Sequence, residues 1–442
     1  MPDERTEHYV QQLAQLIRSE TVSEENQQDK SKFYNFQKQL RSMFPKLFAR
    51  CLHEDFNGSM LLIWKGNGTG LPVMLMNHHD VVEASGNWTY PPFSGTIADG
   101  KLWGRGTLDT KCSLWAMLQA AEELAETGFI PEQDIYFVST CTEETDGSGA
   151  DAISSELHHR GLRFSLVLDE GSMILDDPIS GANGTFAMIG LGEKGCADLK
   201  FIAHSAGGHA STPGTNTPLV RLGKFMAKAE RQNLFSADLH PAIQEMFRRV
   251  ASAMPQPLRF ILGHPDWFKP VLLKVIPVVS ATAGAMLKTT LAFTMAKGSD
   301  GSNVLPQEAW VIGNMRFSHH QGRDRSIEAV RKLAQTFDIE TVVLNPGFSS
   351  DMSDYSSKGF LLIEEAVQTV FPGVIPSPYL MTGASDSRYM SRLCDTCLRF
   401  APIHISEAQL NSIHGIDENG DLSALVPAVD FYKYILLEAA QA

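Results

Sequence analysis

The chain has 442 residues, more than one hydrophobic core usually supports, so we expect two domains. Its 51 acidic side chains against 37 basic ones give a formal charge of −14, which argues against nucleic acid or an anionic membrane as a main partner. Residues 1–18 lack the uninterrupted apolar core of a secretory signal, so we expect a cytoplasmic protein.

The first 190 residues alternate between strand-like and helical patterns. Short apolar runs predict strands at residues 73–77, 135–140 and 164–168, and apolar residues spaced by three and four predict helices at residues 110–126 and 150–159. This alternation is typical of the α/β class. We therefore expect a mostly parallel sheet covered by helices.

The pattern changes between about residues 195 and 346. Strands are predicted at residues 198–203, 291–296, 309–316 and 340–344, with helices at 218–230 and 325–337. This order predicts an α+β unit of the ferredoxin-like kind.

An apolar insertion, residues 235–287, interrupts this unit. The most apolar run of the chain, residues 270–293, is broken by Lys274 and Lys288, which leaves too few residues between them to span a bilayer. We interpret the run as buried or lid-packing surface. The alternative is that the insertion lines a pocket for an acyl group or a side chain.

The last part of the chain returns to the first pattern, with a strand at residues 398–403 and a helix at 422–440 that bends or starts at Pro427. The simplest architecture is a catalytic α/β domain made of residues 1–194 and 348–442. Residues 195–347 would form an inserted lid domain.

Polar side chains follow the predicted strands at the point where each strand ends. His78 and Asp80 follow the first strand, Glu143 and Glu144 the second, and Asp169 ends the third. The carboxyl ends of parallel strands lie along one edge of a sheet, where open α/β folds bind their ligands. So many carboxylates can be buried together only if cations neutralise them. An imidazole with several carboxylates suits zinc, with cobalt or manganese as substitutes.

The spacing of these residues also separates their roles. Neighbours in extended backbone point to opposite sides, so of Glu143 and Glu144 one can bind a metal while the other stays free. A free carboxylate beside a metal-bound water is what a hydrolase needs as its base. Asp80, two residues after His78, is placed to orient the imidazole through its other N–H.

Several segments together resemble a known family. They are His78-His79-Asp80-Val81-Val82, the run from Gly104 to Lys111 (GRGTLDTK), Glu143-Glu144 and Ile413-His414-Gly415. In this order they resemble the motifs of the two-zinc aminoacylase/carboxypeptidase family of metallopeptidases. The resemblance runs from about residue 70 to the end of the chain.

The resemblance implies a role for each matching residue. His78 would bind one zinc ion, Asp109 would bridge both, and Glu144 and His414 would bind the second. Glu143 would be the catalytic base.

One further acidic ligand would complete the first zinc site. Asp169 and Glu170 are adjacent there, and we choose Asp169. The family often has a cis peptide bond after the bridging aspartate, so we expect one between Asp109 and Thr110.

The predicted lid carries its own family-like segments. His209 lies in a segment that resembles the one whose histidine reaches a metal site, often that of a partner subunit, and stabilises the oxyanion. Asn303 and Arg316 lie in segments that resemble those holding the carbonyl and the carboxylate of the substrate, and a guanidinium suits a carboxylate. A homodimer through the lid is therefore possible.

Residues 378–389 and 399–402 resemble most the branch with carboxypeptidase S and the N-acyl-amino-acid hydrolases. That branch commonly has a glycine pair and threonine where this chain has Gly383, Ala384 and Ser385. Gly383 is a candidate substrate-binding residue, and the methyl group of Ala384 would narrow the pocket.

These features predict a metal-dependent hydrolase for the amide bond of a peptide or N-acyl amino acid with a free carboxylate. A dipeptidase and a biosynthetic deacylase or desuccinylase are alternatives within the family. A metal-stabilised binding protein is the alternative from another class. The retained Glu143, to which the resemblance assigns no metal, argues against it.

Overall fold

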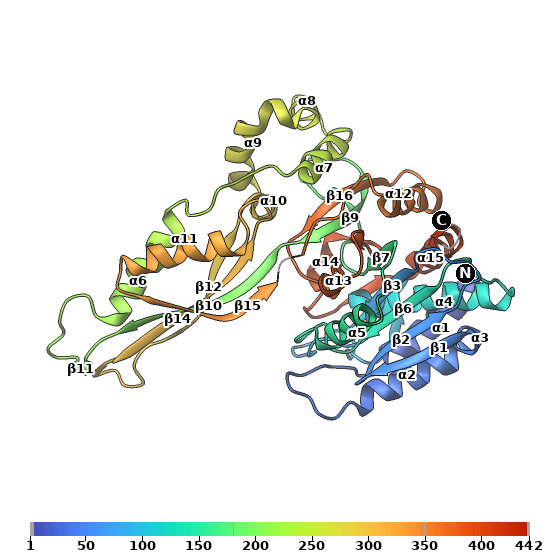
Figure 1. The fold of residues 1–442 in the computed structure, drawn as a ribbon, viewed down its shortest axis with the longest axis horizontal. Coiled ribbons are helices and arrows are strands. Elements are labelled where there is room, and N and C mark those ends of the chain that lie inside the picture. Colours follow the sequence, from blue (N-terminus) through green and yellow to red (C-terminus); the bar gives the residue numbers. More distant parts are fainter. Residues whose placement is uncertain (1–3, 180, 349, 440–442) are drawn as a thin grey trace.

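The computed structural model describes residues 4–179, 181–348 and 350–439 (Figure 1). Its main sheet has the strand order β1-β2-β6-β3-β7-β17-β9-β8-β18, with β16 also paired to β9. The bounds are β1 (Cys51–Phe56), β2 (Ser59–Trp64), β3 (Val73–His78), β6 (Ile135–Thr140), β7 (Leu166–Asp169), β8 (Ile174–Asp176), β9 (Thr185–Glu193), β16 (Ile375–Met381), β17 (Cys397–Arg399) and β18 (His404–Ile405).

The centre of this sheet is parallel. Strand β3 pairs in parallel with β6 on one side and with β7 on the other, and β7 pairs in parallel with β17. Every residue of β3, β6 and β7 is buried, as expected for strands covered on both faces. Antiparallel pairs occur toward the edges, at β1–β2, β2–β6 and β8–β9. The α/β class with a parallel core is confirmed.

Helices pack on both faces of the sheet (Figure 1). One face is covered by α1 (Glu4–Ile17), α4 (Cys112–Glu126), α12 (Lys358–Val370) and α15 (Leu425–Ala439), which share one hydrophobic core with the strands. The other face is covered by α5 (Ser148–His159) and α13 (Ser387–Met390). Among the described helices, none is both long enough and apolar enough to cross a membrane.

Shorter elements surround this core. They are α2 (Ser31–Met43), α3 (Pro45–Arg50), α14 (Glu407–Ser412), the 3-10 turn η2 (Leu422–Ala424), and a small sheet of β4 (Thr96–Ala98), β5 (Lys101–Trp103) and β19 (Asn419–Asp421). Because β19 pairs with β5, the segment after His414 is brought beside the segment that leads to Asp109.

The lid is a four-stranded antiparallel sheet with two helices on one face. Along the chain it contains β10 (Gly195–His204), α6 (Pro218–Arg231), β12 (Thr290–Lys297), β14 (Glu308–Phe317), α11 (Arg323–Gln335) and β15 (Glu340–Phe348), and the strand order is β12-β14-β10-β15. This βαββαβ order confirms the ferredoxin-like prediction. A small pair of strands, β11 (Gly208–His209) and β13 (Val304–Leu305), lies at the end of the lid far from the main sheet (Figure 1).

The insertion forms four helices that share a hydrophobic core with the main sheet rather than with the lid sheet. They are α7 (Pro241–Ala251), α8 (Leu258–Gly263), α9 (Pro265–Val279) and α10 (Ala281–Leu287). Their buried residues share a core with β9 and β16. The prediction that the run from residue 270 is buried is wrong for the outer face of α9, where Val278 is 84% exposed.

Other predictions differ at element ends. The strand predicted at residues 398–403 is two short strands, β17 and β18, separated by Phe400–Ile403. Helix α15 begins at Leu425, so Pro427 lies in its first turn, where a missing N–H costs little. The predicted end of this helix, Ala440, lies outside the described residues. Strand β9 was not predicted.

Candidate metal centre

The parallel strands bring the predicted carboxylates and imidazoles to one edge of the sheet. His78 ends β3, Glu144 follows β6, and Asp169 ends β7. Asp109 lies in the turn η1 (Thr107–Lys111) that leads into α4, where its own backbone is not helical, and His414 follows α14 with a positive φ of 60°. Segments that are far apart in the sequence therefore meet at this edge.

Asp109 lies between two imidazoles. The Nε2 atom of His78 is 3.0 Å from one carboxylate oxygen of Asp109, and the Nε2 atom of His414 is 3.0 Å from the other. Glu144 approaches the second imidazole, with its Oε2 atom 3.1 Å from His414 Nε2. Ligand atoms of His78, Asp109 and Glu144 all lie within 4.8 Å of one another. A carboxylate between two imidazoles is the arrangement that a bridging ligand of two cations requires.

Protonation in the metal-free protein follows from these contacts. Although burial alone would raise it, hydrogen bonds to His414 and His78 hold the pKa of Asp109 below its usual range. The same hydrogen bond to Asp109, together with one to Glu144, raises the pKa of His414 to about 10. The two imidazoles carry the protons that cations would replace.

The turn that carries Asp109 is held by a buried carboxylate that the sequence did not reveal. Glu418 accepts hydrogen bonds from the backbone N–H groups of Leu108 at 2.7 Å and Asp109 at 3.2 Å, and from Arg105 Nη1 at 2.8 Å. Arg105 also donates to the carbonyl of Gly415, next to His414. The peptide bond between Asp109 and Thr110 is cis, as expected. Glu418 thus connects the segments of two candidate ligands.

Asp80 contacts both the imidazole of His78 and the loop that carries Glu143 and Glu144. The Nδ1 atom of His78 is 2.9 Å from the carbonyl oxygen of Asp80 and 3.5 Å from its carboxylate, so the backbone makes the closer contact. The carboxylate accepts hydrogen bonds from the backbone N–H groups of Glu143 and Glu144 and from the hydroxyl of Ser23. Asp80 therefore holds the loop of the predicted base as well as the predicted ligand.

Glu143 is nearly enclosed beside the cluster. Burial, together with the nearby carboxylates of Asp386 and Glu170, raises its pKa well above the usual range, against the opposing effect of His78. Arg388 Nη1 lies 4.0 Å from its carboxylate. A carboxyl group with a raised pKa beside the candidate ligands is suited to general acid–base work.

Asp169 and Glu170 face different partners. Both carboxylate oxygens of Asp169 accept backbone N–H groups, from Glu170 at 2.9 Å and Ser387 at 2.7 Å. Burial raises the pKa of Glu170 well above its usual range, and the charges of Asp109 and Asp169 raise it further. Glu170 is therefore affected by the charge of Asp109, whereas Asp169 holds the loop at Ser387.

The lid does not bring its predicted residues to one place within a single chain. His209 and Asn303 lie together at the far end of the lid, where the Ala210 N–H donates to the Asn303 carbonyl. Arg316 is near the other end, opposite Cys196 at the start of β10. Gly383 is exposed in the loop after β16, and an added Cβ would meet no described atom within 4 Å.

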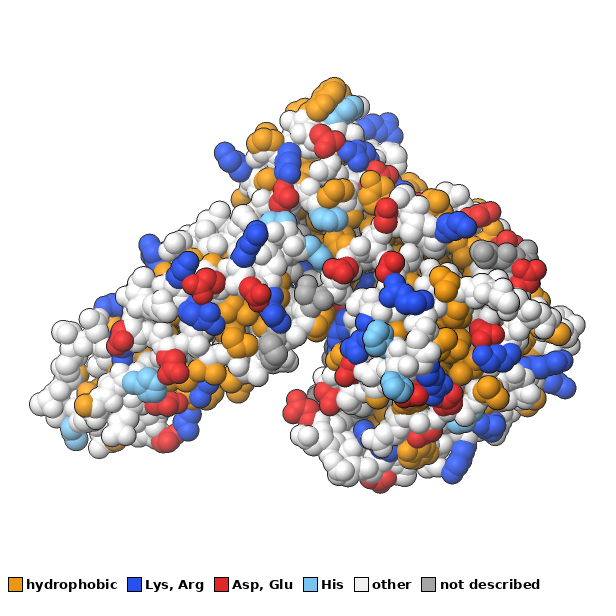
Figure 2. Space-filling view, in the orientation of Figure 1, with side chains coloured by type: hydrophobic (Ala, Val, Ile, Leu, Met, Phe, Trp, Pro, Cys, Tyr) orange, Lys and Arg blue, Asp and Glu red, His pale blue; other side chains and the backbone are white. Residues whose placement is uncertain are grey.

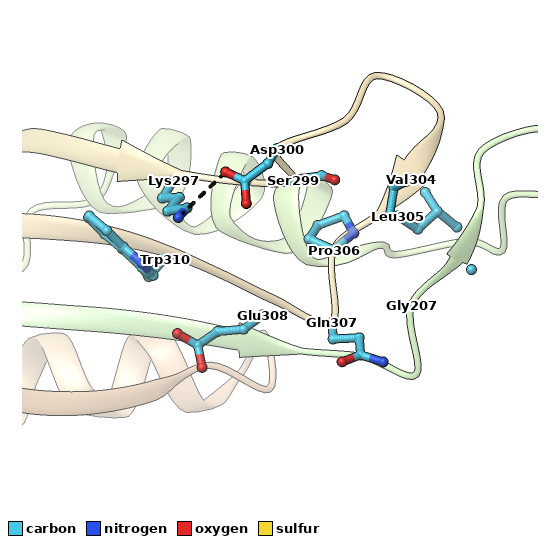
Figure 3. A pocket seen from close by; sticks show the side chains of 12 residues that line it. Gly207, Lys297, Ser299, Asp300, Val304, Leu305, Pro306, Gln307, Glu308 and Trp310 are labelled. Carbon is cyan, nitrogen blue, oxygen red and sulfur yellow. Dashed lines mark ion pairs between the residues drawn. The ribbon is translucent and has the colours of Figure 1, made fainter.

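A pocket at the lid end is lined by Gly207 and Gly208, which precede His209 in the chain, and by no residue of the carboxylate cluster (Figure 3). Its lining carries Glu308 and an ion pair of 3.5 Å between Lys297 and Asp300, with the indole of Trp310 nearby. Among the residues that line this pocket, Asp300 and Glu308 are the only carboxylates and there is no histidine or cysteine, so the lining does not form a candidate metal site.

The donor set fits divalent cations. Imidazole nitrogens and carboxylate oxygens are the usual ligands of zinc in hydrolases. Burial raises the pKa values of Glu143, Glu144 and Glu170, so negative charge on these carboxylates is costly unless a cation lies beside them. Bound cations would supply the missing positive charge.

Comparisons with known proteins identify the family of the chain. The family model described as peptidase family M20/M25/M40 matches residues 74–438. The N-fatty-acyl-amino acid synthase/hydrolase PM20D1 of Xenopus tropicalis is 30% identical, covering 99% of this chain and 86% of the relative. The probable carboxypeptidase S-like 2 of Dictyostelium discoideum is 31% identical, covering 97% and 84%.

A solved structure extends the agreement to the fold. The M20 family metallo-carboxypeptidase Sso-CP2 of Sulfolobus solfataricus has a TM-score of 0.73 at 16% identity, with 99% of both chains covered. Since the family model spans most of the sequence and the relatives cover nearly all of it, the chain belongs to peptidase family M20/M25/M40.

Proposed function

We propose that this enzyme hydrolyses the amide bond of N-acyl amino acids, or of peptides with a free C-terminal carboxylate, with two zinc ions as cofactors. One observation carries the proposal: Asp109 lies between His78 and His414, and each imidazole is 3.0 Å from a different oxygen of its carboxylate. The names of the two curated relatives, an N-fatty-acyl-amino acid hydrolase and a carboxypeptidase S-like protein, support the substrate class.

In this proposal, the residues around the cluster have separate roles in proton transfer and in positioning the base. Two bound cations would polarise the scissile carbonyl and acidify the attacking water. Glu143 accepts the proton of that water and delivers it to the leaving nitrogen. Arg388, 4.0 Å away, limits the positions that the carboxylate of Glu143 can take. Asp80 fixes the loop that carries Glu143 through the backbone N–H of that residue.

We propose Glu170 in place of Asp169 as the remaining acidic ligand. The two oxygens of Asp169 are engaged by backbone N–H groups, so ligation would cost these hydrogen bonds. Glu170 is buried, and burial together with the charge of Asp109 raises its pKa, as expected of a carboxylate that lacks its counter-ion. Asp169 then acts as the anchor of the loop at Ser387.

Substrate recognition would involve the lid. Arg316 lies opposite Cys196, near the start of the first lid strand, β10. It is our candidate for binding the substrate carboxylate, because a guanidinium binds a carboxylate through two hydrogen bonds. His209 and Asn303 lie at the opposite end of the lid. We therefore propose a homodimer in which these two residues complete the site of the partner subunit.

The experiment that tests this function is a substrate screen with added zinc, cobalt or manganese. N-acyl amino acids of increasing acyl length, dipeptides, and dipeptides with a blocked amino group are compared under the same conditions. We expect cleavage of N-acyl amino acids, without a need for a free amino group. Cleavage restricted to free dipeptides would favour a dipeptidase. Bound metal without any cleavage would favour a binding protein and contradict the proposal.

A further inference from the structure

The outer surface of helices α8 and α9 carries a group of exposed apolar side chains. This tip patch consists of Leu258, Phe260, Trp267, Val271, Val275, Val278 and Val279. On α9 the spacing from Trp267 to Val271, Val275 and Val278 places these side chains on one face of the helix. The opposite face, with Leu272 and Ile276, is buried in the core shared with β9 and β16. Helix α9 is therefore apolar on both its inner and outer faces.

The patch lies at a protruding part of the molecule. Figure 1 shows α8 and α9 at the top, away from both the lid sheet and the helices of the catalytic domain. Figure 2 shows hydrophobic side chains gathered there, with lysine and arginine side chains next to them. Trp267 is 71% exposed and stacks on His264, with 4.7 Å between ring centroids. A protruding apolar surface of this kind marks an interaction site rather than a packed core.

The charge of this region is opposite to that of the chain. Residues 258–288 contain four basic side chains, Arg259, Lys269, Lys274 and Lys288, against one acidic side chain, Asp266, whereas the chain as a whole carries −14. The nearby acids are already paired, Asp266 with Arg248 and Asp238 with Lys269. Among the described residues, Arg259 and Lys274 form no ion pair, and both are exposed. Unpaired positive charge therefore borders the apolar surface.

We propose that the tip patch docks this enzyme on an anionic lipid surface. An exposed helix with tryptophan and valine on its outer face and unpaired basic residues at its border has the composition of helices that lie in the interface of a bilayer. A second copy of the chain fits less well, because a two-fold interface through this patch would bring the unpaired positive charges of Lys274 and Arg259 to it from both copies. The expectation of no membrane partner came from the charge of the whole chain, which the tip does not share.

The insertion connects the tip patch to the loop that holds a candidate substrate-binding residue. The insertion packs on β9 and β16, and β16 leads directly into the loop with Gly383. Long-chain N-acyl amino acids are themselves anionic amphiphiles that collect at lipid surfaces. The advantage of meeting such substrates at a lipid surface rests on the proposed function, whereas the docking itself does not.

Vesicle flotation tests the docking with the full chain. Vesicles of phosphatidylcholine alone are compared with vesicles of equal parts phosphatidylcholine and phosphatidylglycerol, at low and at high salt. The double variant Trp267→Asp/Val278→Asp places two charges in the patch, and Leu52→Asp/Leu71→Asp makes the same change at exposed leucines elsewhere.

We expect the unmodified protein and the Leu52/Leu71 control to float with anionic vesicles at low salt and less at high salt. The bound fraction of the Trp267/Val278 variant should fall by at least roughly tenfold. The thermal midpoint of each variant, compared with the parent, shows that loss of flotation is not loss of fold. Absence of flotation for the unmodified protein, or equal flotation of the variant, would overturn the proposal.

Light scattering provides the second readout. If the Trp267/Val278 variant changes from dimer to monomer while the control does not, a second copy covers the patch and the proposal is wrong. Flotation needs no turnover, so its outcome stays separate from that of the substrate screen.

Discussion

Side chains at the candidate metal centre either contribute atoms to the cluster or hold the backbone that carries it, and only the first role was visible in the sequence. His78, Asp109 and Glu144 contribute atoms to the cluster itself. His78 and Glu144 were indicated by their positions after predicted strands, and Asp109 by the family resemblance of its segment. Glu418 contributes no atom to it, yet it accepts the backbone N–H groups of Leu108 and Asp109. A lone glutamate in a predicted loop carries no such signal, because its partners are about 310 residues away.

Replacement of Glu418 should loosen the turn that carries Asp109. Glu418→Gln keeps the size of the side chain but loses the charge that pairs with Arg105, so we expect zinc affinity to fall by roughly 10–100-fold. Competition with a chromophoric chelator measures the affinity. Glu407→Gln, on the exposed side of α14, is the matched control. Unchanged affinity in Glu418→Gln would mean that the turn holds its shape without this carboxylate.

Metal uptake should release a proton from His414. Hydrogen bonds to Asp109 and Glu144 raise the pKa of this imidazole from 6.5 to about 10 in the metal-free protein. The metal needs the neutral form, so below about pH 10 the proton must leave, and affinity should rise as pH increases from about 6 to about 9. Calorimetry in buffers of different ionisation enthalpy counts the released protons. A flat affinity over this range would contradict the assignment.

The choice between Asp169 and Glu170 separates metal binding from loop anchoring. Glu170→Gln should lower the bound metal per chain with little change in thermal stability. Asp169→Asn should keep the metal but weaken the hydrogen bond from Ser387, at a cost of about 1–3 kcal/mol in the free energy of unfolding. Metal analysis and thermal unfolding of both variants decide the assignment. The reverse pattern would restore Asp169 as the ligand.

At the scale of elements, prediction worked where local pattern decides the structure. Strand β6 spans the predicted residues, because an apolar run of this length between turn residues is too short for a typical helix and suits a buried strand. Strand β9 was not predicted, because its glycines resemble turn signals. Its burial also depends on pairing with β16 and β17, which lie about 200 residues away in the sequence. The exposed face of α9 was not predicted either, because the spacing of apolar residues does not show which face of a helix is covered by other elements.

One buried lysine, Lys194, connects the insertion to the segment between β9 and β10. Lys194 Nζ donates to the carbonyls of Ala285 and Lys288, each at 2.8 Å, and burial lowers its pKa to about 7. Lys194→Met would leave these carbonyls without a donor, so we expect a loss of about 1–3 kcal/mol in the free energy of unfolding. Denaturant unfolding measures it, with the exposed Lys228→Met as control. Equal stability of the two variants would show that the contact holds nothing in place.

At the scale of the whole molecule, the position of the lid residues argues for a dimer. His209 lies at the lid end far from the main sheet (Figure 1). If it serves the partner subunit, a chain with His209→Ala and one with Glu143→Gln would each be inactive alone, but their mixed dimer would hold one intact site. Random mixing should then restore about a quarter of the parent activity. No recovery on mixing would mean that each chain uses its own residues or none from the lid.

The central claim is that Glu143 is the base of a metal-dependent amide hydrolase and not one of its ligands. The most direct test is the turnover of Glu143→Gln on the best N-acyl amino acid from the screen, with bound zinc measured in the same sample. We predict full zinc content with a loss of turnover of roughly 10²–10⁴-fold. Unchanged turnover at full zinc content, or turnover lost together with the zinc, would contradict the account.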